Sequence, residues 1–193
     1  MNNFYAMMSR MKYINRWALM RNSYTEDISQ HSLEVSMIAH ALCVIGNKRM
    51  NKNLDGEKAA LIAIYHDATE IITGDMPTPI KYLNSDIMVA FKDIEAKAAN
   101  KLLGMLPEDL REEYEKIFFP SEEDEYICRL VKAADKISAL IKCIEEEKMG
   151  NEEFSSAEIT LRNSIIEMNL AEANVFMGEF LPSYRLTLDQ LQK

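Results

Sequence analysis

Apolar residues recur at intervals of three and four positions along most of this chain. Between residues 29 and 47, one face of the predicted helix carries Val35, Ile38, Leu42 and Ile45. The apolar stripe within residues 121–149 consists of Ile127, Leu130, Val131, Ala134, Ile141 and Ile144. This spacing matches the 3.6-residue turn of an α-helix rather than the two-residue alternation of a strand. We therefore expect an all-α fold.

Capping and helix-breaking residues set the expected boundaries. We expect helices over residues 4–13, 29–47, 55–74, 85–103, 107–118, 121–149 and 153–175. Ser29 and Asp55 are the expected N-caps of their helices, and Pro107 is suited to a first helical turn. Gly150 is a typical residue to follow a helix end. The two prolines within residues 74–79 predict a loop.

Length and composition narrow the class of protein. The 193 residues contain no repeat and no Pro/Gly/Ser-rich linker, so we expect one domain over residues 1–193. The net charge of −9 disfavours nucleic acid as a partner. No apolar run approaches the roughly 18 residues that span a bilayer, and the N-terminus carries no secretion signal. The three cysteines form no CxxC pair and fit reduced thiols. We expect a soluble cytoplasmic protein that binds neither nucleic acid nor membrane.

The chain has three histidines, and helical geometry predicts that two of them, His31 and His40, lie on opposite faces of one helix. At about 100° per residue, the apolar positions of residues 29–47 all fall within roughly 40° of His31. His31 is therefore expected on the buried face, in the first turn of its helix. His40 falls on the opposite face, so we interpret it as a surface or packing residue and not as a metal ligand.

The third histidine belongs to a polar group on an otherwise apolar face. His66 and Asp67 are adjacent, and Glu70 lies within side-chain reach of both on a helix. Burying carboxylates is costly unless they are paired or bind a metal ion. For these three residues together, a functional role is favoured over a purely structural one.

Three further residues are ambiguous when judged from the pattern alone. Asp135 lies at the edge of an apolar stripe near Lys132, where an aspartate is usually solvated or paired with a lysine. Arg16 and Trp17 are adjacent, and a surface charge beside a core anchor accounts for them. The alternative is that Arg16 binds phosphate through two guanidinium N–H groups and that Trp17 forms a pocket wall.

A site of two histidines and two aspartates has a definite chemistry. Such a set suits a divalent ion such as Mn²⁺, Co²⁺, Fe²⁺ or Zn²⁺. An octahedral ion held by four protein ligands keeps positions for a water and a phosphate oxygen, lowers the pKa of that water and polarises the phosphorus. A neighbouring carboxylate outside the ligand set can serve as general acid or base.

Longer strings give the chain a family resemblance. They are INRWALMRN (14–22), SQHSLEVSMIAHAL (29–42), YHDATEIITGDMPTPIKY (65–82), LVKAADKISALIKCIEE (130–146) and GNEEF (150–154). Together they resemble the bacterial 5′-deoxynucleotidase family of the HD-domain superfamily of metal-dependent phosphohydrolases. The likeness runs from about residue 8 to residue 182, and only residues 118–125 match poorly. The fold it implies is an all-α HD-domain helical bundle.

The resemblance implies a role for each matched residue. The metal ligands it implies are His31, His66, Asp67 and Asp135. It implies that Arg16 binds the 5′-phosphate, that Trp17 crowds a ribose 2′-hydroxyl and that Glu70 is the general acid or base. The residues implied for the sugar side of the site are Asp75, which accepts from the 3′-hydroxyl, together with Met76, Pro77 and Thr78.

The resemblance also implies the reaction and the partners. The expected activity is hydrolysis of deoxyribonucleoside 5′-monophosphates to the deoxyribonucleoside and phosphate, with a metal-activated water attacking the 5′-phosphate. One divalent metal ion is expected, cobalt or manganese before iron or zinc. A homodimer is the expected assembly.

Two other functions stay open at the level of sequence. One is an HD-type hydrolase of nucleoside triphosphates or guanosine alarmones; Ile71 after Glu70 counts against alarmones, whose hydrolases typically carry a Glu-Asp pair there. The other is a metal-binding sensor without catalysis, against which the intact Arg16, Glu70 and Asp75 argue. The identity of the released product separates the enzymatic alternatives.

Overall fold

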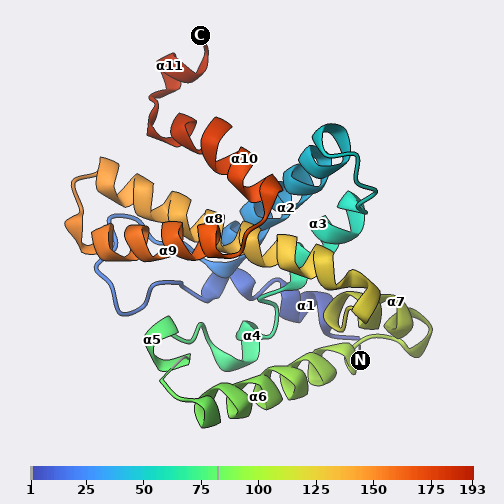
Figure 1. Cartoon of the computed structure of the whole chain (residues 1–193). Coiled ribbons are helices and arrows are strands. Elements are labelled where there is room, and N and C mark those ends of the chain that lie inside the picture. Colours follow the sequence, from blue (N-terminus) through green and yellow to red (C-terminus); the bar gives the residue numbers. More distant parts are fainter. Residues whose placement is uncertain (1, 82) are drawn as a thin grey trace.

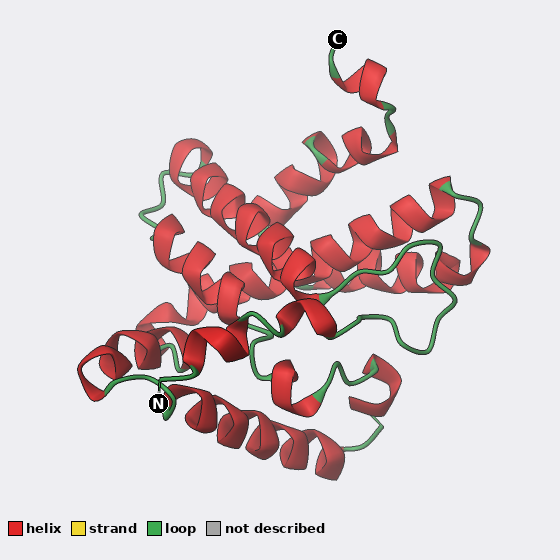
Figure 2. Cartoon of the chain, turned by 180° about the vertical axis from the view of Figure 1, so that it is seen from behind, coloured by secondary structure: helices red, strands yellow, loops and turns green. Residues whose placement is uncertain are grey.

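The computed structural model describes residues 2–81 and 83–193, apart from the side chain of Thr78. Over this part of the chain the fold is all-helical, and its only bridge between extended residues pairs Asn15 with Asp27. The view from behind in Figure 2 shows helices joined by loops and no strand in the described residues. The expected fold class is therefore confirmed.

The helices are labelled in Figure 1. They are α1 (Phe4–Met8), α2 (Ile28–Arg49), α3 (Gly56–Tyr65), α4 (Glu70–Thr73), α5 (Thr78–Lys81), α6 (Ser85–Leu103), α7 (Glu108–Phe118), α8 (Glu125–Lys148), α9 (Ser155–Glu167), α10 (Ala171–Glu179) and α11 (Leu188–Leu191). Short 3-10 helices cover Met11–Tyr13, Glu122–Asp124, Glu152–Phe154 and Leu181–Arg185.

The centre of the molecule is formed by α2, α3 and α8. Helix α2 packs on both α3 and α8, and α9 and α10 lie against this centre (Figure 1). The core between these helices includes Val35, Ile38, Leu42, Ala59, Ala63, Leu130, Ala134, Ile137, Leu140 and Ile141. A smaller cluster consists of Phe4, Ala68, Leu102, Leu103 and Leu106. The apolar stripes predicted for residues 29–47 and 121–149 are thus the faces that pack together.

The N-cap of α2 lies two residues earlier than predicted. Asp27, and not Ser29, is the N-cap: the Asp27 backbone is extended, and its side chain accepts from the amides of Ser29 and Gln30. The Asp27 amide in turn donates to Oε1 of Gln30, which completes a capping box. An aspartate satisfies two amides here because its carboxylate has more acceptor sites than a hydroxyl has. His31 then lies in the first turn, as expected.

The helix predicted for residues 55–74 is interrupted at the point where its polar residues lie. Asp55 caps α3 as expected, but α3 ends at Tyr65. The amides of Ala68 and Glu70 then bond to carbonyls three residues back, at 3.0 Å each, which makes the turn tighter than an α-helix. Gly74, with φ at 75°, ends α4 in a conformation that favours glycine.

Four other parts of the chain also differ from the prediction. The segment 153–175 is two helices, because Asn169 has a φ of 51° and ends the first of them. The segment 4–13 divides into α1 and a 3-10 helix. Pro107 precedes α7 as its N-cap rather than opening it, and part of the predicted loop 74–79 forms the start of α5.

One helix is more apolar than the sequence analysis recognised. By length and composition alone, α2 is able to cross a membrane, with a mean hydropathy of 1.2 over 18 residues. However, 56% of that window is buried inside the molecule against α3 and α8. Such burial is typical of the core helix of a bundle.

Candidate active site

His31 reaches the site from the buried face of α2. Its side chain is fully buried, and its Nε2 lies 3.3 Å from Oδ1 of Asp135 on α8. The same Nε2 lies 3.6 Å from Oδ2 of Asp67. The first turn of α2 thus brings His31 between two carboxylates that come from different elements.

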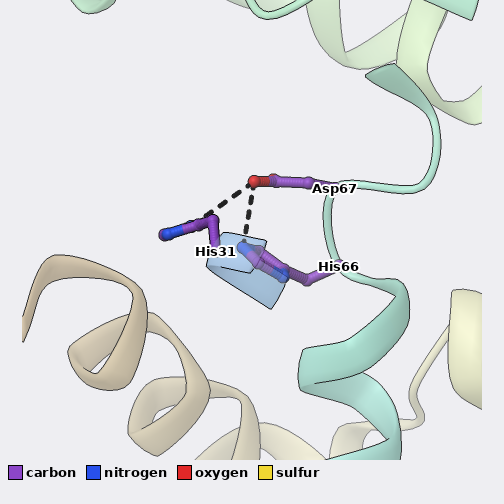
Figure 3. Close-up of side chains that lie close together, drawn as sticks. All are labelled: His31, His66 and Asp67. Carbon is purple, nitrogen blue, oxygen red and sulfur yellow. Dashed lines mark ion pairs between the residues drawn. The ribbon is translucent and has the colours of Figure 1, made fainter. Parts of the chain in front are cut away.

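His66 and Asp67 occupy the tight turn after α3, and Figure 3 shows both side chains directed toward His31. Nδ1 of His66 lies 2.7 Å from the carbonyl oxygen of Ala63, which only accepts a hydrogen bond. This assigns a proton to Nδ1, so in the neutral ring Nε2 carries the lone pair. Oδ2 of Asp67 lies 3.2 Å from that Nε2.

These atoms fit a divalent metal ion. One ligand atom each from His31, His66 and Asp67 lies within 4.8 Å of the others. Nε2 of both histidines is buried without a hydrogen-bond partner in the described residues, and each faces a carboxylate oxygen. A cation satisfies all of these groups at once. Asp135 lies beside this group through its contact with His31, while its other oxygen pairs with Lys132 at 2.5 Å.

Metal ligands must be deprotonated, and three of the four candidate side chains favour that state, while His66 does not. Burial lowers the pKa of His66, but the charge and hydrogen bond of Asp67 outweigh burial and raise it, so a bound metal ion would take the place of a proton on this ring. Burial lowers the pKa of His31, so its ring is neutral. Burial raises the pKa of Asp67, but the charge and hydrogen bond of His66 outweigh this and keep the pKa below its usual range. The pKa of Asp135 is also lowered, because Lys132 and His31 outweigh the effect of burial.

Glu70 has the opposite protonation state. It is the first residue of α4, it is 6% exposed, and its Oε2 has no hydrogen-bond partner in the described residues. Burial and the nearby charges of Asp67 and Asp75 raise the pKa of Glu70 to about 9. A carboxyl group that keeps its proton at neutral pH beside the metal site can act as a general acid.

Arg16 and Trp17 share one acceptor that the sequence analysis missed. Oε2 of the buried Glu26 accepts from Nε of Arg16 at 3.1 Å and from Nε1 of Trp17 at 3.0 Å. Nη1 of Arg16 donates to Oδ2 of Asp67 at 3.2 Å, which links the loop to the metal site. Trp17 has a φ of 59° and packs against Phe154, with ring centroids 5.2 Å apart. No periodicity marks Glu26, because it lies in a loop before its helix.

A cavity of about 700 Å³ opens beside these residues. The residues that the sequence predicted for the site and that line this cavity are Arg16, Trp17, Asp67, Glu70, Asp75, Met76, Pro77 and Asp135. Further lining residues come from α8 and α9, and they include Lys136, Ala139, Ser156, Ala157, Thr160 and Leu161. The side chain of Thr78, also predicted for the sugar side, lies outside the described part of the structure. His31 and His66 are not among the lining residues of this cavity, and His66 instead lines a smaller one of about 190 Å³, together with Asp135. His40 is exposed, as predicted.

The helical bundle has the fold of solved HD-domain phosphohydrolases. The fold is similar to that of an HD-domain phosphohydrolase from Listeria innocua, with a TM-score of 0.80 and 18% identity, over 99% of this chain and 92% of that one. It is also similar to the HD phosphohydrolase of cyanophage S-2L, a structure with dA and one catalytic Zn²⁺ ion. That match has a TM-score of 0.65 and 19% identity, over 94% of this chain and 96% of the other.

Sequence comparison identifies the family within this class. The chain belongs to the YfbR-like 5′-deoxynucleotidase family, whose model matches residues 3–184. It is 45% identical over 192 residues to a 5′-deoxynucleotidase of Erwinia tasmaniensis, covering 100% of this chain and 97% of the relative. It is 46% identical over 191 residues to one of Photorhabdus temperata, covering 99% and 97%. The resemblance stated from the sequence is thereby confirmed.

Proposed function

We propose that this protein is a metal-dependent 5′-deoxynucleotidase that hydrolyses deoxyribonucleoside 5′-monophosphates to the deoxyribonucleoside and phosphate. The observation that carries the proposal is the convergence of two histidines, ionised aspartates and a protonated Glu70 at one side of a cavity that also holds Arg16. The full-length identity to proteins named 5′-deoxynucleotidase supports the same reaction.

The proposed metal ligands are His31, His66, Asp67 and Asp135. When bound, a divalent ion would supply a Lewis acid and lower the pKa of a coordinated water. Two nitrogen and two oxygen ligands suit cobalt or manganese, with iron and zinc as alternatives. The proposal of Asp135 as the fourth ligand is supported by its 3.3 Å approach to His31.

The residues across the cavity would bind and orient the substrate. Arg16 would bind the 5′-phosphate, because it lines the cavity and its bond to Asp67 holds it next to the metal site. Glu70 would donate its proton to the leaving 5′-oxygen. Trp17 would exclude a 2′-hydroxyl. Asp75 would accept from the 3′-hydroxyl, with Met76, Pro77 and Thr78 on the same side.

The assembly and location that we propose are a homodimer in the cytoplasm. Apolar side chains on adjoining helices support the dimer: Leu33 and Met37 of α2 are each 59% exposed, and Leu61 of α3 is 45% exposed. Light scattering on the purified protein gives the mass directly. A monomer at micromolar concentration would count against this part of the proposal.

The test of the reaction is phosphate release from dAMP and from AMP, each with EDTA and with added Co²⁺ or Mn²⁺. The expected result is release from dAMP that depends on the metal, with little release from AMP. Pyrophosphate or tripolyphosphate from a nucleoside triphosphate would indicate a different HD-type hydrolase. Bound metal without release from any nucleotide would support a sensor instead.

A further inference from the structure

A carboxylate lies one turn beyond His31 on α2 and takes no part in the site described so far. Glu34 is half-buried, and its Oε2 accepts a hydrogen bond from Oγ of Ser138 at 2.6 Å. Ser138 is fully buried on α8, one turn beyond Asp135. Residues at this spacing are neighbours on a helix, so Glu34 is next to His31 and Ser138 is next to Asp135.

The hydroxyl of Ser138 also contacts a histidine ring. Its Oγ lies 3.0 Å from Nδ1 of His31. A serine hydroxyl has one proton, and an ionised carboxylate only accepts. When Glu34 is ionised, the proton of Ser138 therefore goes to Glu34, and the Ser138 oxygen accepts from Nδ1–H of His31. Nε2 of His31 then keeps its lone pair on the side that faces Asp67 and Asp135.

The other histidine shows why a carboxylate is needed here. Nδ1 of His66 donates to the backbone carbonyl of Ala63, which cannot donate in return. The partner of His31 is a hydroxyl, which can donate as well as accept. Without Glu34, the Ser138 hydroxyl is free to donate to Nδ1 of His31. The ring would then carry its own proton on Nε2, and a protonated Nε2 cannot bind a metal.

We propose that Glu34 and Ser138 are positioning residues that hold His31 in the tautomer with Nδ1 protonated, so that Nε2 is available to the divalent metal. The inference rests on the metal site of the proposed function and not on the nucleotide substrate. Glu34 on α2 and Ser138 on α8 thus govern the affinity for the metal without contacting the metal or the substrate.

The first test is Co²⁺ binding to metal-free protein, followed by visible absorption. Burial raises the pKa of Glu34 to about 7, so the titrations are run at pH 8, where the carboxylate is ionised. Ser138→Ala should weaken Co²⁺ binding by about 10- to 100-fold. Glu34→Ala should weaken it comparably, whereas Glu34→Gln, which keeps an acceptor oxygen, should stay close to the parent protein.

The double variant separates a linked pair from two independent contributions. If Glu34 acts only through Ser138, the variant carrying both alanines should bind Co²⁺ no more weakly than Ser138→Ala alone. The matched control is Ser36→Ala, which removes another buried α2 hydroxyl, one that donates to the carbonyl of Ala60 at 3.0 Å. It should lower the melting temperature without changing Co²⁺ affinity.

The second test reads the tautomer directly in metal-free protein. The chain has three histidines, so the ring-nitrogen NMR signals can be assigned by single substitutions. His31 should be protonated at Nδ1 in the parent protein and shift toward Nε2 protonation in Glu34→Ala. An unprotonated Nδ1 in the parent, or unchanged Co²⁺ affinity in Ser138→Ala, would overturn the proposal. Neither measurement uses a nucleotide, so loss of the proposed nucleotidase function would leave both results interpretable.

Discussion

The two sides of the cavity are built from different kinds of structure. On the metal side, His31 and Asp135 project from α2 and α8, and His66 and Asp67 occupy a tight turn next to the core. On the substrate side, Arg16 and Trp17 come from the loop before α2. Close packing of long helices holds the metal side in place. Apart from the packing of Trp17 against Phe154, the loop is held by individual hydrogen bonds.

Those bonds tie the loop to the C-terminal half of α8. The backbone amide of Ser23 donates to both carboxylate oxygens of Glu146, at 2.9 and 3.1 Å. Lys142, which is 1% exposed, pairs with Glu146 and donates to the carbonyl of Tyr24 at 2.7 Å. A buried ion pair on α8 is therefore hydrogen-bonded to the loop that carries Arg16. Because the two sides are held by different contacts, we expect substitutions to impair metal binding and substrate recognition separately.

The largest effect should come from the residue that belongs to both sides. Asp67→Ala removes a ligand and the partner of Arg16, so metal retention and phosphate release should be lost together. Metal content after gel filtration and turnover of dAMP measure the two losses. Asp109→Ala, on the exposed surface of α7, is the control and should retain both. Full activity in an Asp67 variant that holds no metal would refute the site assignment.

The second effect should separate chemistry from metal binding. Glu70→Gln should keep the metal but lower kcat by about 10²- to 10⁴-fold, because a general acid is lost. The pKa of Glu70 is raised to about 9, so the parent enzyme should lose activity as the pH rises through that value and the acid loses its proton. The kcat profile of Glu70→Gln should lack this alkaline limb. Near-normal turnover would remove Glu70 from the mechanism.

The metal side was also the more predictable from the sequence. His66, Asp67 and Glu70 stood out because three polar residues interrupt an apolar helical face. Helical register predicted that His31 lies on the buried face, but only the family resemblance implied that it is a ligand, because a core histidine usually just satisfies a hydrogen bond. Asp135 did not stand out, because its pairing with Lys132 is the ordinary surface interaction of such a residue. Its approach to His31 is a contact between two helices, and no local pattern reports such a contact.

The substrate side was accessible only through the family resemblance. The positions of the Arg16 and Trp17 side chains depend on Glu26, a loop residue that no periodicity identifies. Several predicted helix boundaries were wrong because a boundary depends on the backbone conformation of a single residue, which periodicity does not report. The extended Asp27 displaced the predicted cap at Ser29, and the positive φ of Asn169 divided a predicted helix.

The third effect should be on the substrate side and on stability. Lys142→Met leaves Glu146 buried without its cationic partner, which typically costs about 3–5 kcal/mol of unfolding free energy. Urea denaturation measures that cost, and KM for dAMP should rise while Co²⁺ affinity changes little. Lys97→Met, which removes the exposed Lys97–Asp93 pair, is the matched control and should cost no more than about 1 kcal/mol. Equal costs in the two variants would show that the buried pair is not an anchor.

The smallest effect should be on specificity alone. Trp17→Leu shortens the side chain that is proposed to exclude a 2′-hydroxyl. The ratio of kcat/KM for AMP over dAMP should therefore rise, by up to about 10²-fold, which is the limit for rejecting one added hydroxyl by shape. Trp17→Phe keeps a ring against Phe154 but loses the bond to Glu26, so it separates the bulk of the side chain from its anchoring. If bulk decides, only the leucine variant changes the ratio. If anchoring decides, both variants change it. An unchanged ratio in both, with lower activity on dAMP, would mean that Trp17 supports the loop while selectivity against ribose resides in other residues of the cavity.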